Sequence, residues 1–561
     1  MKQIIECVPN FSEGRDLSVI KQITDVIEGV PGIRMLNVDP GYATNRTVVT
    51  FVGEPKLVVE AAFLAIQRAA ELIDMRHHKG EHPRFGATDV CPLVPVSEIT
   101  MEETVEYART LARRVGEELS IPVYCYEFAA FEAKRQSLAN CRAGEYEGLA
   151  EKLKSTAWKP DFGPDIFNEH SGAVAIGARN FLIAYNINLN TSSVRLANSI
   201  AFDVREAGRI QREGDQVTGK IVKDEHGEPV RIPGTLKKVR AIGWFIKEYG
   251  IAQISMNLID IGITPLHKAF DEVCESARNR GIRVTGSELI GIIPLQSLLD
   301  AGIYFLNKQH RSVGIPDREI IKIAVKSLGL DELAPFDPEK RVIEYLLQDE
   351  NNPLISLSLT EFTYETASES PAPGGGSTAA YVGAIGAALG TMVANLSSQK
   401  RGWDQRWEEF SDWAVQGKSS YEELLKLVDQ DTDAFKLVIE AFKLPKGSDK
   451  EVIARKNAIQ TATLKAMEVP YRVMQSAYNS MNLIEAMAVQ GNPSSITDAG
   501  VGALCAAAAV SGAYLNVLVN AAGIENKVAI RELLDEAENL ESRSRERCAT
   551  IQNIILSKLK E

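Results

Sequence analysis

The chain has 561 residues, of which 45% are hydrophobic and 24% are charged, so it can bury several cores and extensive disorder is excluded. Because 75 acidic residues outnumber 62 basic ones and the formal net charge is -13, the chain as a whole lacks the positive surface of a nucleic-acid-binding protein. The seven cysteines form no CxxC pair, and we therefore expect a cytoplasmic protein with reduced thiols and no disulfide framework.

The first 330 or so residues alternate strand-like runs with amphipathic helical segments, which predicts an α/β fold. The strand-like runs are Ile4–Val8, Thr47–Val52, Val123–Tyr126 and Phe181–Ile187, and the helical segments are Leu17–Val30, Leu57–Ile73 and Met101–Leu119. The pattern restarts near residue 188, so we expect one α/β subdomain over residues 1–180 and a second over residues 181–332. A polar, turn-rich stretch at residues 212–234 indicates an exposed hairpin or a flexible insertion.

Strand signals nearly vanish after a polar linker at residues 333–353, and an all-α helical bundle is predicted over residues 354–561. Within it, the helical segment at residues 450–488 should be kinked or restarted at Pro470. Two other segments, residues 378–398 and 501–523, approach the length of a membrane span. Their apolarity comes mainly from Ala and Gly, which drive insertion weakly, so we expect closely packed helices and no membrane association.

Three of the seven histidines lie within six residues in the segment DMRHHKGEHPRFGATDVCP: His77, His78 and His82. A zinc-binding helix is disfavoured, because Gly80 and Pro83 interrupt a regular helix and the HExxH order is absent. A loop histidine can accept and donate a proton near neutral pH, which would suit catalysis. On these residues alone, surface histidines that cap or hydrogen-bond the loop are the better explanation.

Longer motifs favour a catalytic role for one of these histidines. In order, they are ECVPNFSEGR, NVDPGYATNRTVVTFVG, HKGEHPRFGATDVCPLVPV, RAGEYEGL, PDFGP and FLIAYNINL, and they resemble the glutamate formimidoyltransferase family through about residue 330. The resemblance implies two α/β subdomains with a mixed sheet that bind tetrahydrofolate between them. It also implies that His82 is the catalytic acid–base group, which takes the proton from N5 of tetrahydrofolate and returns it to the leaving nitrogen of glutamate.

Further residues are candidates for binding. Asp39 and Arg46, in the NVDPGYATNR motif, could orient the substrate and bind a carboxylate, although a salt bridge that fixes the loop is equally consistent. The resemblance implies that the segment GPDIFNEHSG contacts folate, with an ordinary connecting loop as the alternative. Its residues are Gly163, Pro164, Asp165, Ile166, Phe167, Asn168, Glu169, His170, Ser171 and Gly172.

One helix of the second half has an acidic residue where its apolar stripe requires an apolar one. Asp431 occupies the missing position of a stripe formed by Leu424, Val428, Phe435, Val438 and Phe442. We expect Asp431 to point into the bundle or into an interface, where an unpaired carboxylate is costly. A carboxylate satisfied by a helix N-terminus or by a lysine is the structural alternative.

The motifs LTEFTYETASESPAPGGGSTAAYVGAIGAALG and LVDQDTDAF resemble the formimidoyltetrahydrofolate cyclodeaminase family, from about residue 357 to the carboxyl end. The resemblance implies that Asp431 is the catalytic residue, and a carboxyl group with a raised pKa would suit proton donation to the leaving ammonia. The turn Pro373–Ser377 could bind an anionic group of folate or could simply cap a helix. Lys400, Arg401, Arg406 and Lys418 could meet a polyglutamate tail, but a solvated face explains them better.

These motifs identify the chain as a member of the bifunctional formimidoyltransferase-cyclodeaminase family. We expect transfer of the formimidoyl group of N-formimidoyl-L-glutamate to tetrahydrofolate, with or without a polyglutamate tail, and then cyclodeamination of 5-formimidoyltetrahydrofolate to 5,10-methenyltetrahydrofolate and ammonia. No metal is expected, and the Ala/Gly-rich helices predict a homo-oligomer. The alternatives are a metal-dependent formimidoylglutamate amidohydrolase that uses His77, His78 and His82, and a folate-binding oligomer whose active sites have decayed.

Overall fold

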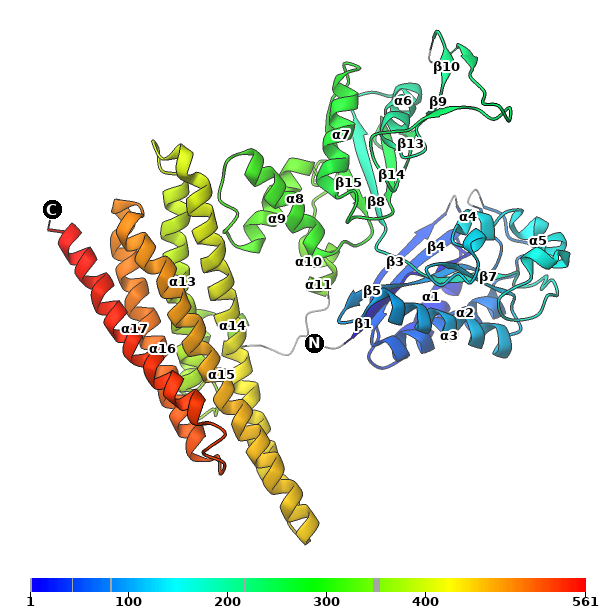
Figure 1. Ribbon diagram of the computed structural model, residues 1–561. Helices are drawn as coiled ribbons and strands as arrows, with labels where there is room; N and C mark the ends of the chain where they lie inside the picture. The colour runs from blue at the N-terminus through cyan, green and yellow to red at the C-terminus, as the bar shows by residue number, and fades with distance from the viewer. Residues whose placement is uncertain (1–2, 43, 81–82, 216–217, 347–353, 561) are drawn as a thin grey trace. The chain divides into compact units, whose positions relative to one another are not determined.

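The computed structural model describes residues 3–42, 44–80, 83–215, 218–346 and 354–560. The chain forms two compact units: residues 1–300 with 328–348, and residues 301–327 with 349–561. The described part of the first unit contains two larger β-sheets and two short two-stranded ones with helices, and the described part of the second is helical (Figure 1). The predicted fold class, α/β followed by all-α, is confirmed.

A seven-stranded mixed sheet organises the first subdomain, as the resemblance implied. Its strands are β1 (Ile4–Cys7), β2 (Asn10–Phe11), β3 (Arg34–Gly41), β4 (Arg46–Gly53), β5 (Thr88–Ser97), β6 (Val123–Glu127) and β7 (Val174–Ala178). The strands β1 and β2 pair in antiparallel fashion with both β4 and β5, whereas β7 is parallel to β5 and β6. The amino ends of β4, β5 and β7 therefore lie at one edge of the sheet.

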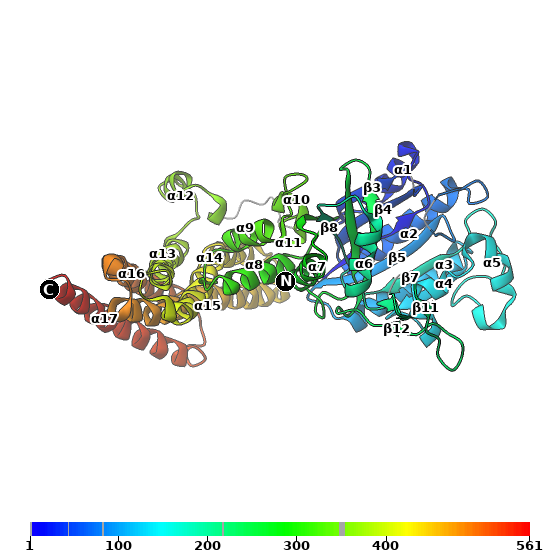
Figure 2. The ribbon, with the colours of Figure 1, turned by 90° about the horizontal axis from the view of Figure 1, so that it is seen from above.

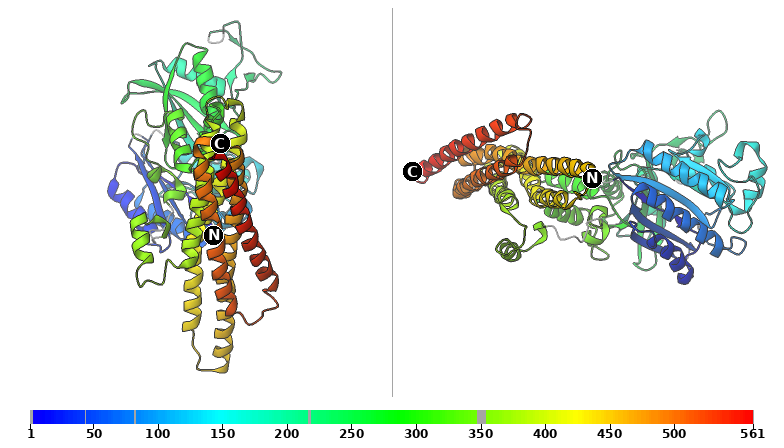
Figure 3. Two further views of the ribbon diagram at one scale, coloured as in Figure 1. Left: turned by 90° about the vertical axis from the view of Figure 1, so that its left-hand side faces the viewer. Right: turned by 90° about the horizontal axis from the view of Figure 1, so that it is seen from below.

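Three amphipathic helices cover one face of this sheet: α1 (Leu17–Glu28), α2 (Pro55–Leu72) and α3 (Met101–Glu118). They lie side by side in Figures 1 and 3. Alternate strand residues such as Ile5 and Cys7 are buried against them, as the two-residue period of a strand requires. Two short helices, α4 (Leu138–Cys141) and α5 (Glu145–Lys154), pack on part of the other face.

The second subdomain has a four-stranded antiparallel sheet in the order β13 (Val239–Ile246), β14 (Ile251–Leu258), β8 (Ile183–Leu189) and β15 (Val284–Ile290). Helices α6 (Val194–Val204) and α7 (Leu266–Arg278) pack against it. The polar stretch predicted as a hairpin or insertion forms two short pairings, β9 (Arg209–Ile210) with β12 (Arg231–Ile232) and β10 (Arg212–Glu213) with β11 (Lys220–Ile221). The unit also includes α10 (Pro338–Arg341), α11 (Ile343–Leu346) and the start of α8 (Leu295–Lys308).

The helical unit is a bundle of long helices with a short α12 (Leu359–Thr366) before it. The bundle helices are α13 (Gly375–Ser398), α14 (Trp407–Lys443), α15 (Asp449–Gln490), α16 (Ile496–Ala522) and α17 (Arg531–Lys558). Residues 301–327, which include most of α9 (Asp317–Leu328), also belong to this unit (Figure 2). They are held there by Asn395, whose amide donates to Gly314 O at 3.0 Å, and by an ion pair between Lys418 and Asp317.

The predicted restart at Pro470 is wrong, because α15 continues through this residue and is 42 residues long; the kink stays a prediction. A proline has no N–H to donate to the carbonyl four residues earlier, here that of Ala466. Instead, the side-chain amide of Asn520 on α16 donates to Ala466 O at 2.8 Å. A neighbouring helix therefore satisfies the carbonyl that Pro470 leaves without its usual partner.

Two stretches of the described chain, Gly375–Ser398 and Pro493–Ala522, are long and apolar enough to cross a membrane. Within the structure, 56% of the most apolar window of the first is buried, against 39% for the second. Length and composition alone are weak evidence for a span, since core helices pass the same test. The prediction of close packing is visible at Gly386, where an added Cβ would lie 2.8 Å from Gly502 O.

Candidate functional sites

The loop between α2 and β5 carries the clustered histidines. His82 lies outside the described residues, as does Glu81, and the loop is described on either side of them. His77 is exposed, with its ring nitrogen 3.9 Å from the Asp74 carboxylate. Among the described residues, no group of three or more His, Cys, Asp and Glu side chains is placed to hold a metal ion.

His78 holds the part of the loop that precedes His82. The ring is buried, its Nε2 lies 2.8 Å from Asn45 O, and its Nδ1 accepts from Arg84 Nε at 3.3 Å. Burial lowers the pKa of His78 despite the hydrogen bond to Asn45, so the neutral imidazole donates through Nε2 and accepts through Nδ1. Both ring nitrogens are engaged, which makes His78 a structural residue of this loop.

A buried carboxylate holds the part of the loop that follows His82. Asp89, at the start of β5, is fully buried and accepts from Arg46 at 2.5 Å, from Arg142 at 2.9 Å and from the Phe85 N–H at 3.1 Å. The same two arginines donate to Pro83 O, at 3.4 and 3.1 Å respectively. The main chain next to His82 is thus fixed by two guanidinium groups that share one carboxylate.

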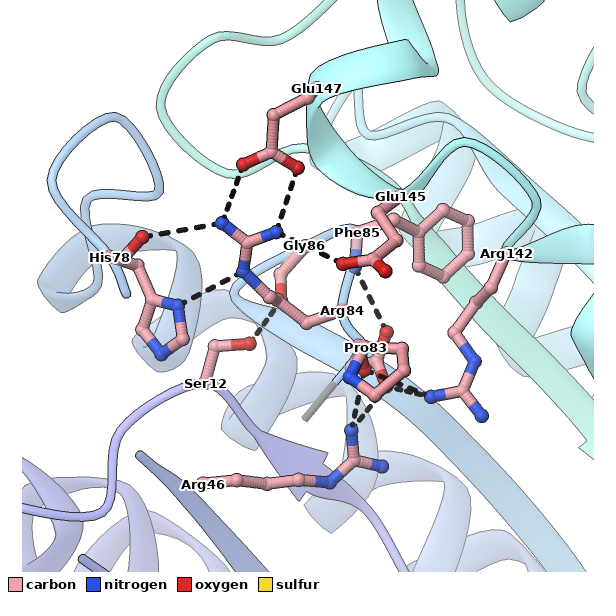
Figure 4. A network of polar contacts seen from close by, with 11 residues as sticks. Ser12, Arg46, His78, Pro83, Arg84, Phe85, Gly86, Arg142, Glu145 and Glu147 are labelled. Carbon is pink, nitrogen blue, oxygen red and sulfur yellow. Dashed lines mark hydrogen bonds and ion pairs between the residues drawn. The ribbon is translucent and has the colours of Figure 1, made fainter. Parts of the chain in front are cut away.

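Arg84 connects this loop to α5. Its guanidinium donates to both carboxylate oxygens of Glu147 at 2.8 Å and lies 3.4 Å from the Glu145 carboxylate (Figure 4). The hydrogen bond from Arg84 holds the pKa of Glu147 below its usual value. These side chains line an open cavity of about 490 Å³, together with Lys79, Gly80 and Gly144. A charged cavity of this size beside the histidine loop is consistent with a polar substrate.

The predicted folate segment is brought to this loop by its second half. Gly172 has φ 68°, and a Cβ there would lie 2.2 Å from Phe85 O, so the two loops touch main chain to main chain. His170 O accepts from Met75 N, and Ser171 O accepts from Ala87 N, both at 2.8 Å. The ring of Phe167 lies 5.3 Å from that of Tyr146 in the RAGEYEGL motif.

The first half of the segment lies elsewhere. A Cβ at Gly163 would lie 2.3 Å from Ile121 O, so this end packs beside α3 and not against the histidine loop. Asp165 pairs with Lys159 at 3.3 Å, and Ile166 is 71% exposed. Pro164 is partly buried in the same turn. The folate role of these four residues stays a prediction.

Asp39 and Arg46 do not share the environment that sequence alone suggested. Asp39 is exposed on the edge strand β3, opposite Val48. Arg46 is largely buried, and its carboxylate partner is Asp89. Its Nε also donates to Asn10 Oδ1 at 2.9 Å. A salt bridge does fix the loop, therefore, but it is made by Arg46 with a residue that sequence reasoning did not select.

In the helical unit, Asp431 of α14 and the PGGGS turn come together. The Ser377 hydroxyl donates to the Asp431 carboxylate at 3.0 Å, and a Cβ at Gly376 would lie 2.2 Å from Asp431 Oδ1. Burial raises the pKa of Asp431, and hydrogen bonds from the side chain and main chain of Ser377 lower it by less. The carboxylate is therefore held at the amino end of α13 in a form that retains a proton more readily than a free aspartate.

The apolar stripe that singled out Asp431 is only half correct. Leu424 and Val428 are fully buried and Val438 is partly buried, but Phe435 is 45% exposed and Phe442 is 55% exposed. The carboxyl-terminal part of α14 runs with α15 past the ends of the other bundle helices (Figure 3). The possibility that basic residues of this unit bind a polyglutamate tail is also weakened, because Lys418 forms an ion pair with Asp317 and Arg406 forms one with Glu409.

Comparison with known proteins places both halves of the chain in one family. Residues 4–179 match the model of the formiminotransferase domain, N-terminal subdomain; residues 184–348 match that of the formiminotransferase domain; and residues 358–539 match formiminotransferase-cyclodeaminase. The formimidoyltransferase-cyclodeaminase of Mus musculus is 43% identical over 547 residues, 96% of this chain and 97% of the relative. The chain belongs to the formimidoyltransferase-cyclodeaminase family.

Each half of this formimidoyltransferase-cyclodeaminase family member also has relatives of its own. The glutamate formimidoyltransferase of Thermoplasma acidophilum is 43% identical over 324 residues, which are 57% of this chain and 98% of that protein. The methenyltetrahydrofolate cyclohydrolase of Methylorubrum extorquens is 37% identical over 174 residues, which are 31% of this chain and 84% of that protein. The family and fold expected from the motifs are confirmed.

Sequence reasoning missed the residues that hold the histidine loop between α2 and β5. They are Asp89, Arg84, Arg142, Glu145 and Glu147. Three of them lie in the RAGEYEGL motif, which was used only as evidence of resemblance. The available signal was its charge pattern, Arg-x-x-Glu-x-Glu, opposite the Arg and Asp of the PRFGATD segment. Such complementary charges predict ion pairs only when the two segments are known to be neighbours.

Proposed function

We propose that this chain performs two consecutive reactions of histidine-derived one-carbon metabolism. It transfers the formimidoyl group of N-formimidoyl-L-glutamate to tetrahydrofolate, and it then converts 5-formimidoyltetrahydrofolate to 5,10-methenyltetrahydrofolate and ammonia. The observation that carries the proposal is that one chain spans 97% of a bifunctional relative and 98% of a single glutamate formimidoyltransferase. The remaining residues form most of the helical unit, which has its own partly buried acid, Asp431.

In the first reaction, N5 of tetrahydrofolate attacks the formimidoyl carbon and the glutamate nitrogen leaves with a proton. We assign the proton relay to His82, which takes the N5 proton and gives it to the leaving nitrogen. Support comes from the fixed main chain beside it, since Pro83 O is held by Arg46 and Arg142. Preorganisation of this kind places a catalytic group without reorganisation during the reaction.

In the second reaction, N10 attacks the same carbon and ammonia leaves. We assign proton donation to Asp431, because burial raises its pKa and so keeps the acid form available. Its hydrogen bond from Ser377 fixes the direction of the carboxyl group. Asp39, Arg46 and the segment 163–172 are proposed to contact folate or glutamate; for Arg46, the contact would be made from its place beside Asp89.

The proposal extends to the setting of the enzyme. Tetrahydrofolate, including its polyglutamylated forms, is the co-substrate and no metal takes part. The protein works in the cytoplasm as a homo-oligomer. Support for self-association comes from α13 and α16, which keep exposed apolar side chains such as Met392 and Leu504 on the surface of the bundle.

The experiment measures methenyltetrahydrofolate by its absorbance after formimidoylglutamate and tetrahydrofolate are supplied. His82→Ala should abolish transfer while supplied 5-formimidoyltetrahydrofolate is still deaminated, and Asp431→Ala should do the reverse. Treatment with chelator should change neither rate. Loss of both activities in each variant, with folding intact, would refute two separate sites. Turnover without tetrahydrofolate would favour an amidohydrolase instead.

A further inference from the structure

The turn between α4 and α5 carries Arg142, Glu145 and Glu147 to the histidine loop. Its backbone is unusual, because Gly144 has φ 89° and Glu145 has φ 52°, both in the left-handed region. A glutamate rarely adopts this conformation unless the surrounding structure holds it there. Something in this part of the chain must therefore fix the turn.

Lys152, one of the last residues of α5, reaches back to this turn. Its Nζ donates to three main-chain carbonyls: Asn140 O at 3.0 Å, Cys141 O at 2.5 Å and Ala143 O at 3.3 Å. The helix α4 has only four residues, so it ends before a further helical turn can bond its last carbonyls, although Asn140 O also accepts from the Ala143 N–H at 3.3 Å. The ammonium also lies 4.2 Å from the centre of the Trp158 ring, which limits its movement.

Arg142 connects this turn to the main chain beside His82. Arg142 follows Cys141 directly, and its guanidinium donates to Pro83 O at 3.1 Å and to the Asp89 carboxylate at 2.9 Å. Pro83 is the residue after His82. We propose that Lys152 is a positioning residue for formimidoyl transfer, which fixes the Arg142 turn and, through Arg142, the main chain beside His82. The inference rests on the proposed role of His82.

The charge of Lys152 gives this role a pH dependence. The titratable and charged groups around it are Cys141 on α4, Tyr124 on β6 and Arg135 before α4. Burial lowers the pKa of Lys152, Cys141 opposes this shift and Arg135 adds to it, and together they bring the pKa to about 8. Burial raises the pKa of Cys141 to about 11 and also raises that of Tyr124.

As the pH rises, Lys152 therefore loses its proton before Cys141 and Tyr124 lose theirs. The ammonium has three N–H groups for three carbonyls, whereas the neutral amine has two. The charge that strengthens these hydrogen bonds is lost at the same time. Transfer should be supported below a pH of about 8 and should decline as the pH rises through that value.

The test uses the full-length protein and follows transfer from formimidoylglutamate to tetrahydrofolate across pH 8, with kcat and KM measured separately. Lys152→Met should lower kcat about tenfold or more with a much smaller change in KM, and should lose the alkaline decline. Lys152→Arg should keep most of kcat and move the decline to higher pH, since guanidinium stays charged. Lys154→Met, on the same helix but exposed, is the matched control and should behave as wild type.

Deamination of supplied 5-formimidoyltetrahydrofolate should be unchanged in every variant, which verifies that the rest of the chain is folded. If the wild-type chain transfers and Lys152→Met keeps the wild-type kcat, the inference is overturned. It is equally overturned if both Lys152 variants keep the wild-type alkaline decline, or if only the unfolding temperature falls. A wild-type chain that does not transfer would instead refute the proposed function itself.

Discussion

The carboxylate of Asp431 lies against main chain that leaves no space for a side chain. A Cβ at Gly376 would be 2.2 Å from Oδ1 and 2.6 Å from Oδ2 of Asp431, and real Cβ atoms do not approach so closely. The glycine therefore lets α13 bring the Ser377 hydroxyl to the acid. In physical terms, the PGGGS turn is needed for close approach as well as for helix initiation.

We predict that Gly376→Ala will displace the Asp431 carboxylate and lower the rate of cyclodeamination about 100-fold, because a misplacement of about 1 Å is enough for such a loss. Formimidoyl transfer by the same protein should be unaffected. Both rates can be measured with supplied substrates. Gly374→Ala is the matched control, since a Cβ there would meet nothing within 4 Å. Equal rates in the two variants would show that the close approach has no role in the reaction.

Candidate residues could be selected from sequence where they broke a local rule or stood in a long motif, and their catalytic roles stay predictions. Asp431 interrupted an apolar stripe, and His82 stood in a long motif, so both could be selected without a structure. Asp89 and Arg142 could not, because 53 residues separate them and only the sheet brings them together. The failure of the stripe at Phe435 and Phe442 has a related cause: helical period predicts a common face but not how far a neighbouring helix extends along it.

At the scale of elements, the strong periodic patterns predicted the fold well. The runs at residues 17–30 and 101–119 became α1 (Leu17–Glu28) and α3 (Met101–Glu118) with changes of one or two residues at their carboxyl ends. The strand β7 (Val174–Ala178) was missed because its Ala and Gly residues have weak strand preference. The restart at Pro470 was wrongly predicted because the donor to Ala466 O, Asn520, is 54 residues away in sequence; a local rule cannot include a donor supplied by another helix.

The replacement of the missing Pro470 N–H by the Asn520 amide at Ala466 O can be tested by a double-mutant cycle on the free energy of unfolding. Asn520→Ala should cost about 1–2 kcal/mol, because Ala466 O loses its donor inside the bundle. With Pro470→Ala, residue 470 regains an N–H for that carbonyl, so the further cost of Asn520→Ala should fall to a few tenths of a kcal/mol. Denaturant unfolding of the four proteins measures both values. Strictly additive costs would mean that Asn520 does not replace the missing N–H.

At the scale of the whole molecule, the chain is divided in a way that sequence patterns did not suggest. Residues 301–327 belong to the helical unit although they precede residues 328–348 of the first unit. Gly314 accounts for part of this association, since a Cβ there would lie 2.4 Å from that of Ala414. Composition changes mark where strands give way to helices, but they carry no information about which core a short helical segment joins.

The helical unit also exposes apolar side chains on two of its helices. Met392 and Leu396 on α13 are 38% and 46% exposed, and Val501 and Leu504 on α16 are 51% and 53% exposed. The two helices contact each other along their length, so these residues belong to one pair of neighbouring helices. Exposed apolar stripes of this kind are typical of surfaces that are covered by another protein chain.

If a second copy of the chain covers these helices, Leu504→Glu should reduce the size of the assembly, because a carboxylate buried at an apolar interface without a partner costs several kcal/mol. Sedimentation velocity should show a smaller species at a concentration where the wild-type chain is associated. Circular dichroism should show an unchanged helix content. The control is Leu359→Glu on α12, where the leucine is 70% exposed and the size should stay that of wild type. A wild-type chain that sediments as a monomer, or a Leu504→Glu variant of wild-type size, would argue against self-association through α16.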